Sequence, residues 1–137
     1  MAQDLIHDAV KNALEKADWQ IIADPFRLDF KNFTLRADIA AKHLSHDGED
    51  EVRIIVEVKS FVGNSFVGEL QQAIGQYLMY QDAIRLNELD YSLYLGISAD
   101  AFISYFAQSG TQFAVQQYHL KLLVVDIAQE EILQWIE

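Results

Sequence analysis

Apolar residues recur at helical spacing in three stretches of the chain. Residues 4–17 place an apolar face on a helix that Asp4 is suited to cap, with these residues on that face: Ile6, Ala9, Val10, Ala13, Leu14 and Ala17. Residues 63–87 predict a second helix capped by Ser65, whose inward-facing residues are Leu70, Ala73, Ile74, Tyr77 and Leu78. Residues 99–118 predict a third helix that is interrupted at Gly110.

Shorter apolar or alternating runs predict strands between these helices. They cover residues 19–23, 34–44, 52–61, 91–98, 120–126 and an edge strand at 131–137, and residues 26–30 alternate as in an extended segment. A polar turn at 45–51 joins two of them as a hairpin. The order is roughly α-β-β-β-α-β-α-β. A hairpin combined with β-α-β crossovers predicts an α/β (α+β) fold, with a mixed β-sheet flanked by helices. The length of 137 residues favours one domain over 1–137.

The strand RIIVEVKSF carries two charged residues near its end. Because side chains alternate along a strand, Glu57 and Lys59 project to the same side, opposite Val58. Asp38 lies in the preceding predicted strand, and pairing through the polar turn brings it near residue 59. The sequence therefore predicts two carboxylates and one ammonium group together at the end of the sheet.

Phosphodiester hydrolysis is the chemistry that such a trio suits. Asp38 and Glu57, with the backbone carbonyl of Val58, offer the oxygen ligands that Mg²⁺ or Mn²⁺ prefers. A bound divalent ion polarises the phosphate and lowers the pKa of a bound water. Lys59 is placed to orient that water or to stabilise charge on the phosphate. The alternative without a catalytic role is a solvated strand end at which these charged side chains form ion pairs.

A polar stripe on the second predicted helix supports the trio. Gln72, Gln76 and Tyr80 follow one another at intervals of four, so they share one side of that helix. From there they can reach the sheet end and contact a phosphate or a metal-bound water. The alternative is a solvated face or the rim of an interface.

Charge and composition narrow the classes of function. The net charge is −11, whereas a DNA-binding domain that acts alone is usually basic. Residues 1–59 hold eight Lys and Arg against twelve acids, giving −4; the rest hold two against nine, giving −7. Contact with DNA is therefore expected to be helped by a partner.

The chain has no cysteine, which excludes disulfides and thiolate metal sites. No signal peptide or membrane span is expected, and the protein is predicted to be cytoplasmic.

Two resemblances sharpen this picture. The element order and the Asp…Glu-x-Lys pattern resemble the PD-(D/E)xK nuclease superfamily, whose restriction-endonuclease-like core is α-β-β-β-α-β. Over almost the whole chain, the segments DLIHDAVKNALEKADWQIIADP, VEVKSFVGNSFVGELQQAIGQYLMY, SLYLGIS and QWIE are similar to the XisH family, the fdxN element excision controlling factors. That likeness implies a role in programmed excision of a DNA element during heterocyst formation. It also implies an XisI-type partner protein and a separate site-specific recombinase.

The resemblance also assigns residues. Asp38, Glu57 and Lys59 occupy the superfamily's metal and catalytic positions, and Gln76 and Tyr80 match its Gln-x-x-x-Tyr signature. The first helix of such nucleases often adds an acidic residue, for which Asp4 or Asp8 is suited, and His7 can also reach the site.

Two functions stay open: a metal-dependent, DNA-acting enzyme, or a non-catalytic module that assembles with its partner. Aromatic residues in the acidic second half favour an interface: Phe102, Tyr105, Phe106, Phe113 and Tyr118. The oligomeric state is open, with a homo-oligomer among the expectations.

Overall fold

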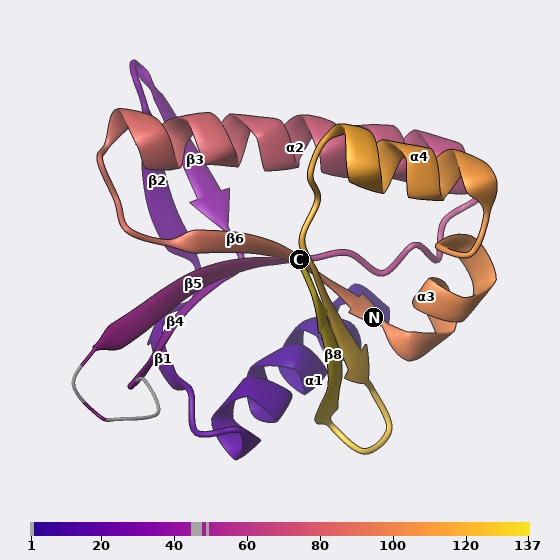
Figure 1. Ribbon diagram of the computed structural model, residues 1–137, viewed down its shortest axis with the longest axis horizontal. Coiled ribbons are helices and arrows are strands. Elements are labelled where there is room, and N and C mark those ends of the chain that lie inside the picture. Colours follow the sequence, from indigo (N-terminus) through magenta and orange to yellow (C-terminus); the bar gives the residue numbers. More distant parts are fainter. Residues whose placement is uncertain (1, 45–47, 49) are drawn as a thin grey trace.

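The computed structural model describes residues 2–44, 48 and 50–137, with residues 2–4 described by their backbone alone. Within these residues the elements follow one another in this order (Figure 1): α1 (Ala2–Lys16), β1 (Gln20–Ala23), β2 (Phe26–Phe30), β3 (Phe33–Ala37), β4 (Ile39–Leu44), β5 (Glu51–Val58), α2 (Phe66–Leu86), β6 (Ser92–Ser98), α3 (Ala99–Tyr105), α4 (Ser109–Gln117), β7 (Leu122–Asp126) and β8 (Glu131–Ile136). The order agrees broadly with the sequence prediction. The differences concern the strand predicted at 34–44 and details of the three predicted helices.

One mixed sheet forms the centre of the fold. Among the described residues it has six strands in the order β1-β4-β5-β6-β7-β8. The neighbours β5, β6 and β7 run parallel, while β1, β4 and β8 pair antiparallel with their neighbours. β5 and β6 are buried on both faces, as their nearly continuous apolar sequences require. The predicted mixed sheet flanked by helices is therefore confirmed.

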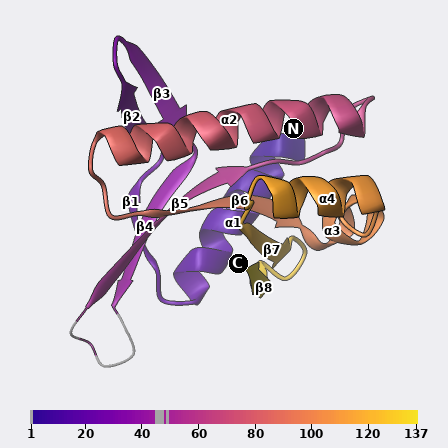
Figure 2. The same cartoon turned by 45° about the horizontal axis from the view of Figure 1, so that its top comes forward.

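Helices cover both faces of this sheet. Figures 1 and 2 show α1 on one side and α2 with α4 on the other. Val10 and Leu14 of α1 pack with Val56 of β5 in one buried cluster, and Tyr77 of α2 packs with Ile55 in the second. Adjacent residues of β5 therefore enter opposite clusters, which confirms the alternation predicted for this strand.

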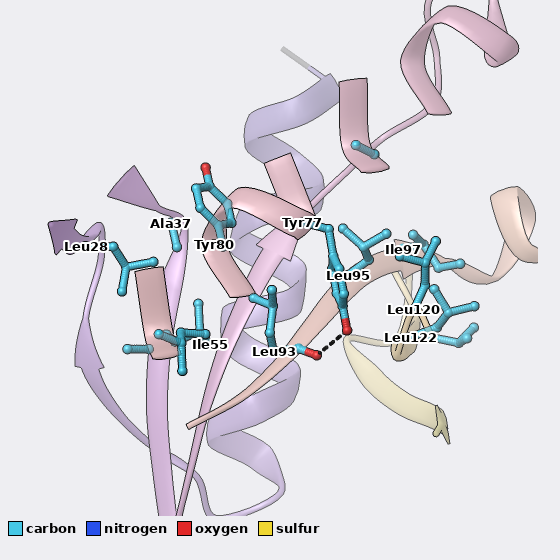
Figure 3. Packing of buried hydrophobic residues seen from close by; sticks show 14 of the residues in the cluster. Leu28, Ala37, Ile55, Tyr77, Tyr80, Leu93, Leu95, Ile97, Leu120 and Leu122 are labelled. Atoms are coloured by element: carbon cyan, nitrogen blue, oxygen red, sulfur yellow. Dashed lines mark hydrogen bonds between the residues drawn. The ribbon is translucent and has the colours of Figure 1, made fainter. Parts of the chain in front are cut away.

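The prediction of one strand over residues 34–44 was wrong. The chain leaves a small two-stranded sheet, β2–β3, after Ala37 and enters the main sheet at Ile39, with Asp38 in the bend between them. The hairpin turns away because its apolar face packs against α2; Figure 3 shows Leu28 and Ala37 close to Tyr80. Every residue in the stretch is compatible with a strand, so the sequence pattern does not reveal a change of sheet.

The second predicted helix is confirmed with a different inward face. Ser65 caps α2 as expected, since its hydroxyl accepts a hydrogen bond from the Gly68 amide at 3.1 Å. Leu78, predicted to point inward, is 38% exposed. The buried stripe passes instead from Tyr77 to Tyr80, because the β2–β3 hairpin covers that side of the helix.

Two other helix predictions were also wrong in detail. α1 begins at Ala2, so Asp4 lies within its first turn rather than at its N-cap, and the side chain of Asp4 is outside the described part of the chain. The break in the third predicted helix falls before Gly110, which lies inside α4. α3 ends at Tyr105, and its C-cap residue Phe106 is buried and packs against Phe61 and Phe102. Burial of that aromatic ring sets the break, and the glycine does not.

Gly96 marks a close approach between β6 and its neighbours. A Cβ atom at this position would lie 2.8 Å from Val56 Cγ1 and 3.6 Å from Val10 Cγ1. The first distance is too short for a normal contact, and both partners are fully buried. The absence of a side chain at Gly96 therefore lets β5, β6 and α1 pack together.

Replacing Gly96 by Ala is expected to lower the free energy of unfolding by about 1–3 kcal/mol, because the added methyl group overpacks the core. Urea unfolding at constant pH measures this. Gly75→Ala is the matched control, since a Cβ there meets nothing within 4 Å in the exposed side of α2. That variant should be about 0.5–1 kcal/mol more stable than the wild type. Equal stability of Gly96→Ala and the wild type would contradict the packing argument.

Candidate functional site

Asp38 and Glu57 lie together at the end of the β4–β5 pair. β4 and β5 pair with Ile39 opposite Val56, which places position 38 beside position 57. The amide of Asp38 donates to Glu57 Oε1 at 3.1 Å, and the amide of Val58 donates to Asp38 Oδ2 at 2.8 Å. Each carboxylate is thus fixed by a backbone amide through one oxygen atom.

Lys59 follows directly after β5 and completes the trio. Its Nζ lies 3.7 Å from Glu57 Oε2, and its amide is held by the carbonyl of Gly96 at 2.9 Å. Glu57 is only 5% exposed. Burial, and then the negative charge of Asp38, raise the pKa of Glu57 to about 7, although Lys59 opposes the shift. Lys59 therefore offsets the burial of Glu57 and the charge of the half-buried Asp38 only in part.

The polar stripe of α2 faces this trio. Burial, followed by the negative charges of Glu57 and Asp38, raises the pKa of Tyr80, whose hydroxyl donates to the Arg36 carbonyl at 3.0 Å. Gln72 lines a cavity of about 110 Å³ together with Lys59. Gln76 lies on the helix between these two contacts. In the part of the chain that the structure describes, Gln76 Oε1 is the buried side-chain atom that lacks a hydrogen-bond partner.

His7 of α1 also lies beside the acidic pair. Its Nδ1 lies 4.0 Å from Asp38 Oδ1, and its Nε2 lies 2.9 Å from Asp24 Oδ1. Lys11, one turn further along α1, contacts the other Asp24 oxygen at 3.0 Å. Burial alone would raise the pKa of Asp24, but the hydrogen bonds and charges of His7 and Lys11 outweigh it and lower that pKa. Asp8 is exposed.

The geometry brings together most of the residues singled out from the sequence. Asp38 lies opposite residue 57 rather than near 59, a difference of two residues in register. Val58 contributes its amide to the cluster through Asp38, a contact that the sequence analysis did not include. Asp24 was also missed, because it lies between the two extended segments predicted at 19–23 and 26–30 and was given no role of its own. Its sequence signal is the spacing of His7 and Lys11, which share one side of a helix.

The donor set fits a hard divalent cation such as Mg²⁺. The two carboxylates each keep a second oxygen, Asp38 Oδ1 and Glu57 Oε2, beyond the one that binds an amide. Gln76, on the same helix as Tyr80, has a buried side-chain oxygen without a hydrogen-bond partner. Over residues 2–44, 48 and 50–137, no three histidine or acidic side chains converge closely enough to hold a metal by themselves. Mg²⁺ is commonly held by only one or two carboxylates with water and phosphate, so two suffice.

The six-stranded mixed sheet flanked by helices, the element order and the acid–acid–lysine cluster at the end of β5 define a mixed α+β fold of the kind that the resemblance to the PD-(D/E)xK class leads one to expect. The family follows from the sequence. The model of the family described as XisH protein matches residues 1–133, and the chain belongs to the XisH family.

Solved structures agree with this assignment. An XisH family protein from Nostoc punctiforme PCC 73102 is 35% identical, with a TM-score of 0.87 over 98% of this chain and 100% of that one. An fdxN element excision controlling factor protein from Anabaena variabilis is 36% identical, also with a TM-score of 0.87, over 98% of this chain and 99% of that one. A search among curated proteins gave no match. Of the helices that the structure describes, none combines the length and apolar character needed to span a bilayer.

Proposed function

We propose that this chain is an excision controlling factor that acts on DNA by metal-dependent phosphodiester hydrolysis at Asp38, Glu57 and Lys59. The excision role is supported by the relative from Anabaena variabilis, which is similar over nearly the full length of both chains. The hydrolytic role is carried by one observation. Two carboxylates are held side by side by backbone amides, and the buried member has a pKa raised to about 7.

That observation favours a cation site because the arrangement is unfavourable without one. A buried carboxylate next to a second carboxylate destabilises the ionised form, and Lys59 at 3.7 Å offsets this only in part. Perturbed pKa values of this kind cluster at functional sites. A bound Mg²⁺ or Mn²⁺ would supply Lewis-acid activation of the phosphate and of a water molecule.

The side chains divide the remaining tasks. Asp38 and Glu57 would hold the cation through their second carboxylate oxygens, which do not bind a backbone amide, and the Val58 carbonyl is the further ligand proposed from sequence. The ammonium group of Lys59, just beyond the carboxyl end of β5, stabilises negative charge that develops on the phosphate. Gln76 on α2 would contact the phosphate, whereas Tyr80 supports this side of the site through its hydrogen bond to the Arg36 carbonyl. Asp4, in the first turn of α1, stays a sequence-based candidate for an added ligand.

Incubation with linear, nicked and branched DNA and Mg²⁺ or Mn²⁺ tests this proposal. The wild type is expected to cleave at least one form, and Glu57→Gln, Asp38→Asn and Lys59→Met to lose about 100-fold or more of that rate. Glu51→Gln is the matched control, because it makes the same change at the other end of β5. Calorimetry with Mn²⁺ should show binding to the wild type and to Glu51→Gln but not to Glu57→Gln. Cleavage by Glu57→Gln at the wild-type rate would contradict the assignment.

A non-catalytic interaction module is the second candidate. Its support is a set of apolar side chains that α3, α4 and the residue after α4 expose: Ile103, Phe113 and Tyr118. Of the aromatic residues predicted from sequence to form an interface, Phe106 is buried instead. The exposed ones lie in the acidic half of the chain and suit the XisI-type partner that the family resemblance implies. Mn²⁺ binding without cleavage of any DNA form, with or without that partner, would favour this candidate.

A further inference from the structure

Asp24 and His7 form a connected pair beside the acidic site, and the proposed trio does not use them. Neither residue belongs to β5 or to its sheet neighbours' ends at the trio: His7 comes from α1, and Asp24 comes from the turn between β1 and β2. Both side chains are partly buried, with 22% and 24% of their surface exposed. His7 lies between Asp24 and Asp38, contacting the first through Nε2 and facing the second through Nδ1.

The carboxylate of Asp24 determines which nitrogen of the His7 ring carries the proton. An ionised carboxylate only accepts hydrogen bonds, so the Nε2 atom at 2.9 Å must carry the proton. Asp24 is ionised at neutral pH like an ordinary aspartate, and the hydrogen bonds and charges of His7 and Lys11 lower its pKa further despite its partial burial. In the neutral ring the other nitrogen, Nδ1, is then an acceptor that faces Asp38 Oδ1. A histidine that acts near a metal commonly donates its second ring N–H to a carboxylate in this way.

The distance between His7 Nδ1 and Asp38 Oδ1 determines whether the two atoms interact directly or through water. At 4.0 Å, Nδ1 and Oδ1 are too far apart for a direct hydrogen bond. One water molecule can contact both atoms across such a gap. Asp38 Oδ1 is also the oxygen that would be available to the proposed cation, so a water held between these two atoms would lie next to the cation site. Lys11 binds the opposite oxygen of Asp24 and does not contact Asp38.

We propose that Asp24 is a positioning residue that holds His7 with Nδ1 as an acceptor, and that His7 orients the attacking water molecule against Asp38. The assignment rests on the proposed hydrolytic function. It adds to that function a second group, His7, which lies next to Asp38, whereas Lys59 lies next to Glu57.

Nitrogen-15 NMR of the imidazole at pH 8.5 tests the first step without metal or DNA. The wild type is expected to show His7 protonated on Nε2, with two well-separated ¹⁵N shifts. In Asp24→Ala the two tautomers should exchange, so the shifts move toward each other. Lys11→Met is the matched control, because it removes the other partner of Asp24 and should leave the His7 shifts unchanged. An unchanged spectrum in Asp24→Ala would overturn the proposal.

Single-turnover cleavage tests the second step. Asp24→Ala and His7→Ala are each expected to lower the rate by about 10–100-fold at saturating DNA, with little change in DNA affinity. The double variant should lose no more than His7→Ala alone, because Asp24 acts through His7. Lys11→Met should cleave at the wild-type rate. Normal cleavage by Asp24→Ala would overturn this role alone, whereas no cleavage by the wild type would overturn the proposed function and this role with it.

Discussion

Glu57→Gln is expected to be more stable than the wild type at pH 8 by about 3 kcal/mol, a shift of the Glu57 pKa from 4.5 to about 7 converted to free energy. A carboxyl group with a raised pKa holds its proton more tightly in the folded state. Its contribution to stability is therefore complete below pH 4.5 and is lost as the pH rises through about 7. Gln cannot ionise, and its amide oxygen can still accept the hydrogen bond from Asp38.

Urea unfolding at pH 4.5 and at pH 8 measures this effect. The difference between Glu57→Gln and the wild type should be small at the lower pH and large at the higher one. Glu51→Gln provides the contrast, because a hydrogen bond from Arg53 lowers the pKa of Glu51 despite a small opposing effect of desolvation. That exposed residue should give no gain at pH 8. A variant at position 57 that is less stable than the wild type at pH 8 would show that the acidic pair is not under strain.

Tyr77→Phe is expected to lower the free energy of unfolding by about 2–6 kcal/mol, because it leaves two backbone groups in the interior unpaired at about 1–3 kcal/mol each. The Tyr77 hydroxyl donates to the Leu93 carbonyl at 3.1 Å, the bond drawn in Figure 3, and accepts from the Lys121 amide at 3.2 Å. It thus bridges β6 and the start of β7 where their pairing begins. Tyr77 is 1% exposed, so water cannot replace the hydroxyl without reorganisation.

Chemical denaturation at pH 7 measures the loss, and Tyr80→Phe is the comparison within the same helix. The Tyr80 hydroxyl donates to one backbone carbonyl, that of Arg36, so its removal should cost only about 1 kcal/mol. Equal losses for the two variants would mean that the bridge between β6 and β7 contributes nothing beyond an ordinary hydrogen bond.

The parts of the fold that the sequence predicts are those with a strong local pattern. The continuous apolar runs of β5 and β6 indicate buried parallel strands, and the stripe from Leu70 to Tyr77 indicates a helix on the sheet. Their chain order then implies the mixed sheet. The split between β3 and β4 is not predictable in this way, because it depends on packing against α2 by residues distant in sequence. The position of the break before α4 depends in the same way on burial of Phe106.

The same division holds for the candidate site. Asp38, Glu57 and Lys59 could be selected because charged residues in or beside apolar strands are unfavourable unless they are paired. Their closeness follows from hairpin pairing, which the sequence places within two residues of the observed register. The role of Asp24 could not be predicted, since the contact joins a turn to a helix 17 residues earlier in the chain. Local propensity carries no information on such a contact.

The separation of the β2–β3 hairpin from the main sheet has a practical consequence for protein engineering. The two carboxylates are fixed by amides of Asp38 and Val58, and the turn at Lys31 and Asn32 lies at the far end of the hairpin. Residues inserted at that tip leave the pairing of β4 with β5 unaltered. A fluorophore or an affinity tag placed there would report on, or immobilise, the protein while the contacts of the two carboxylates stay unchanged.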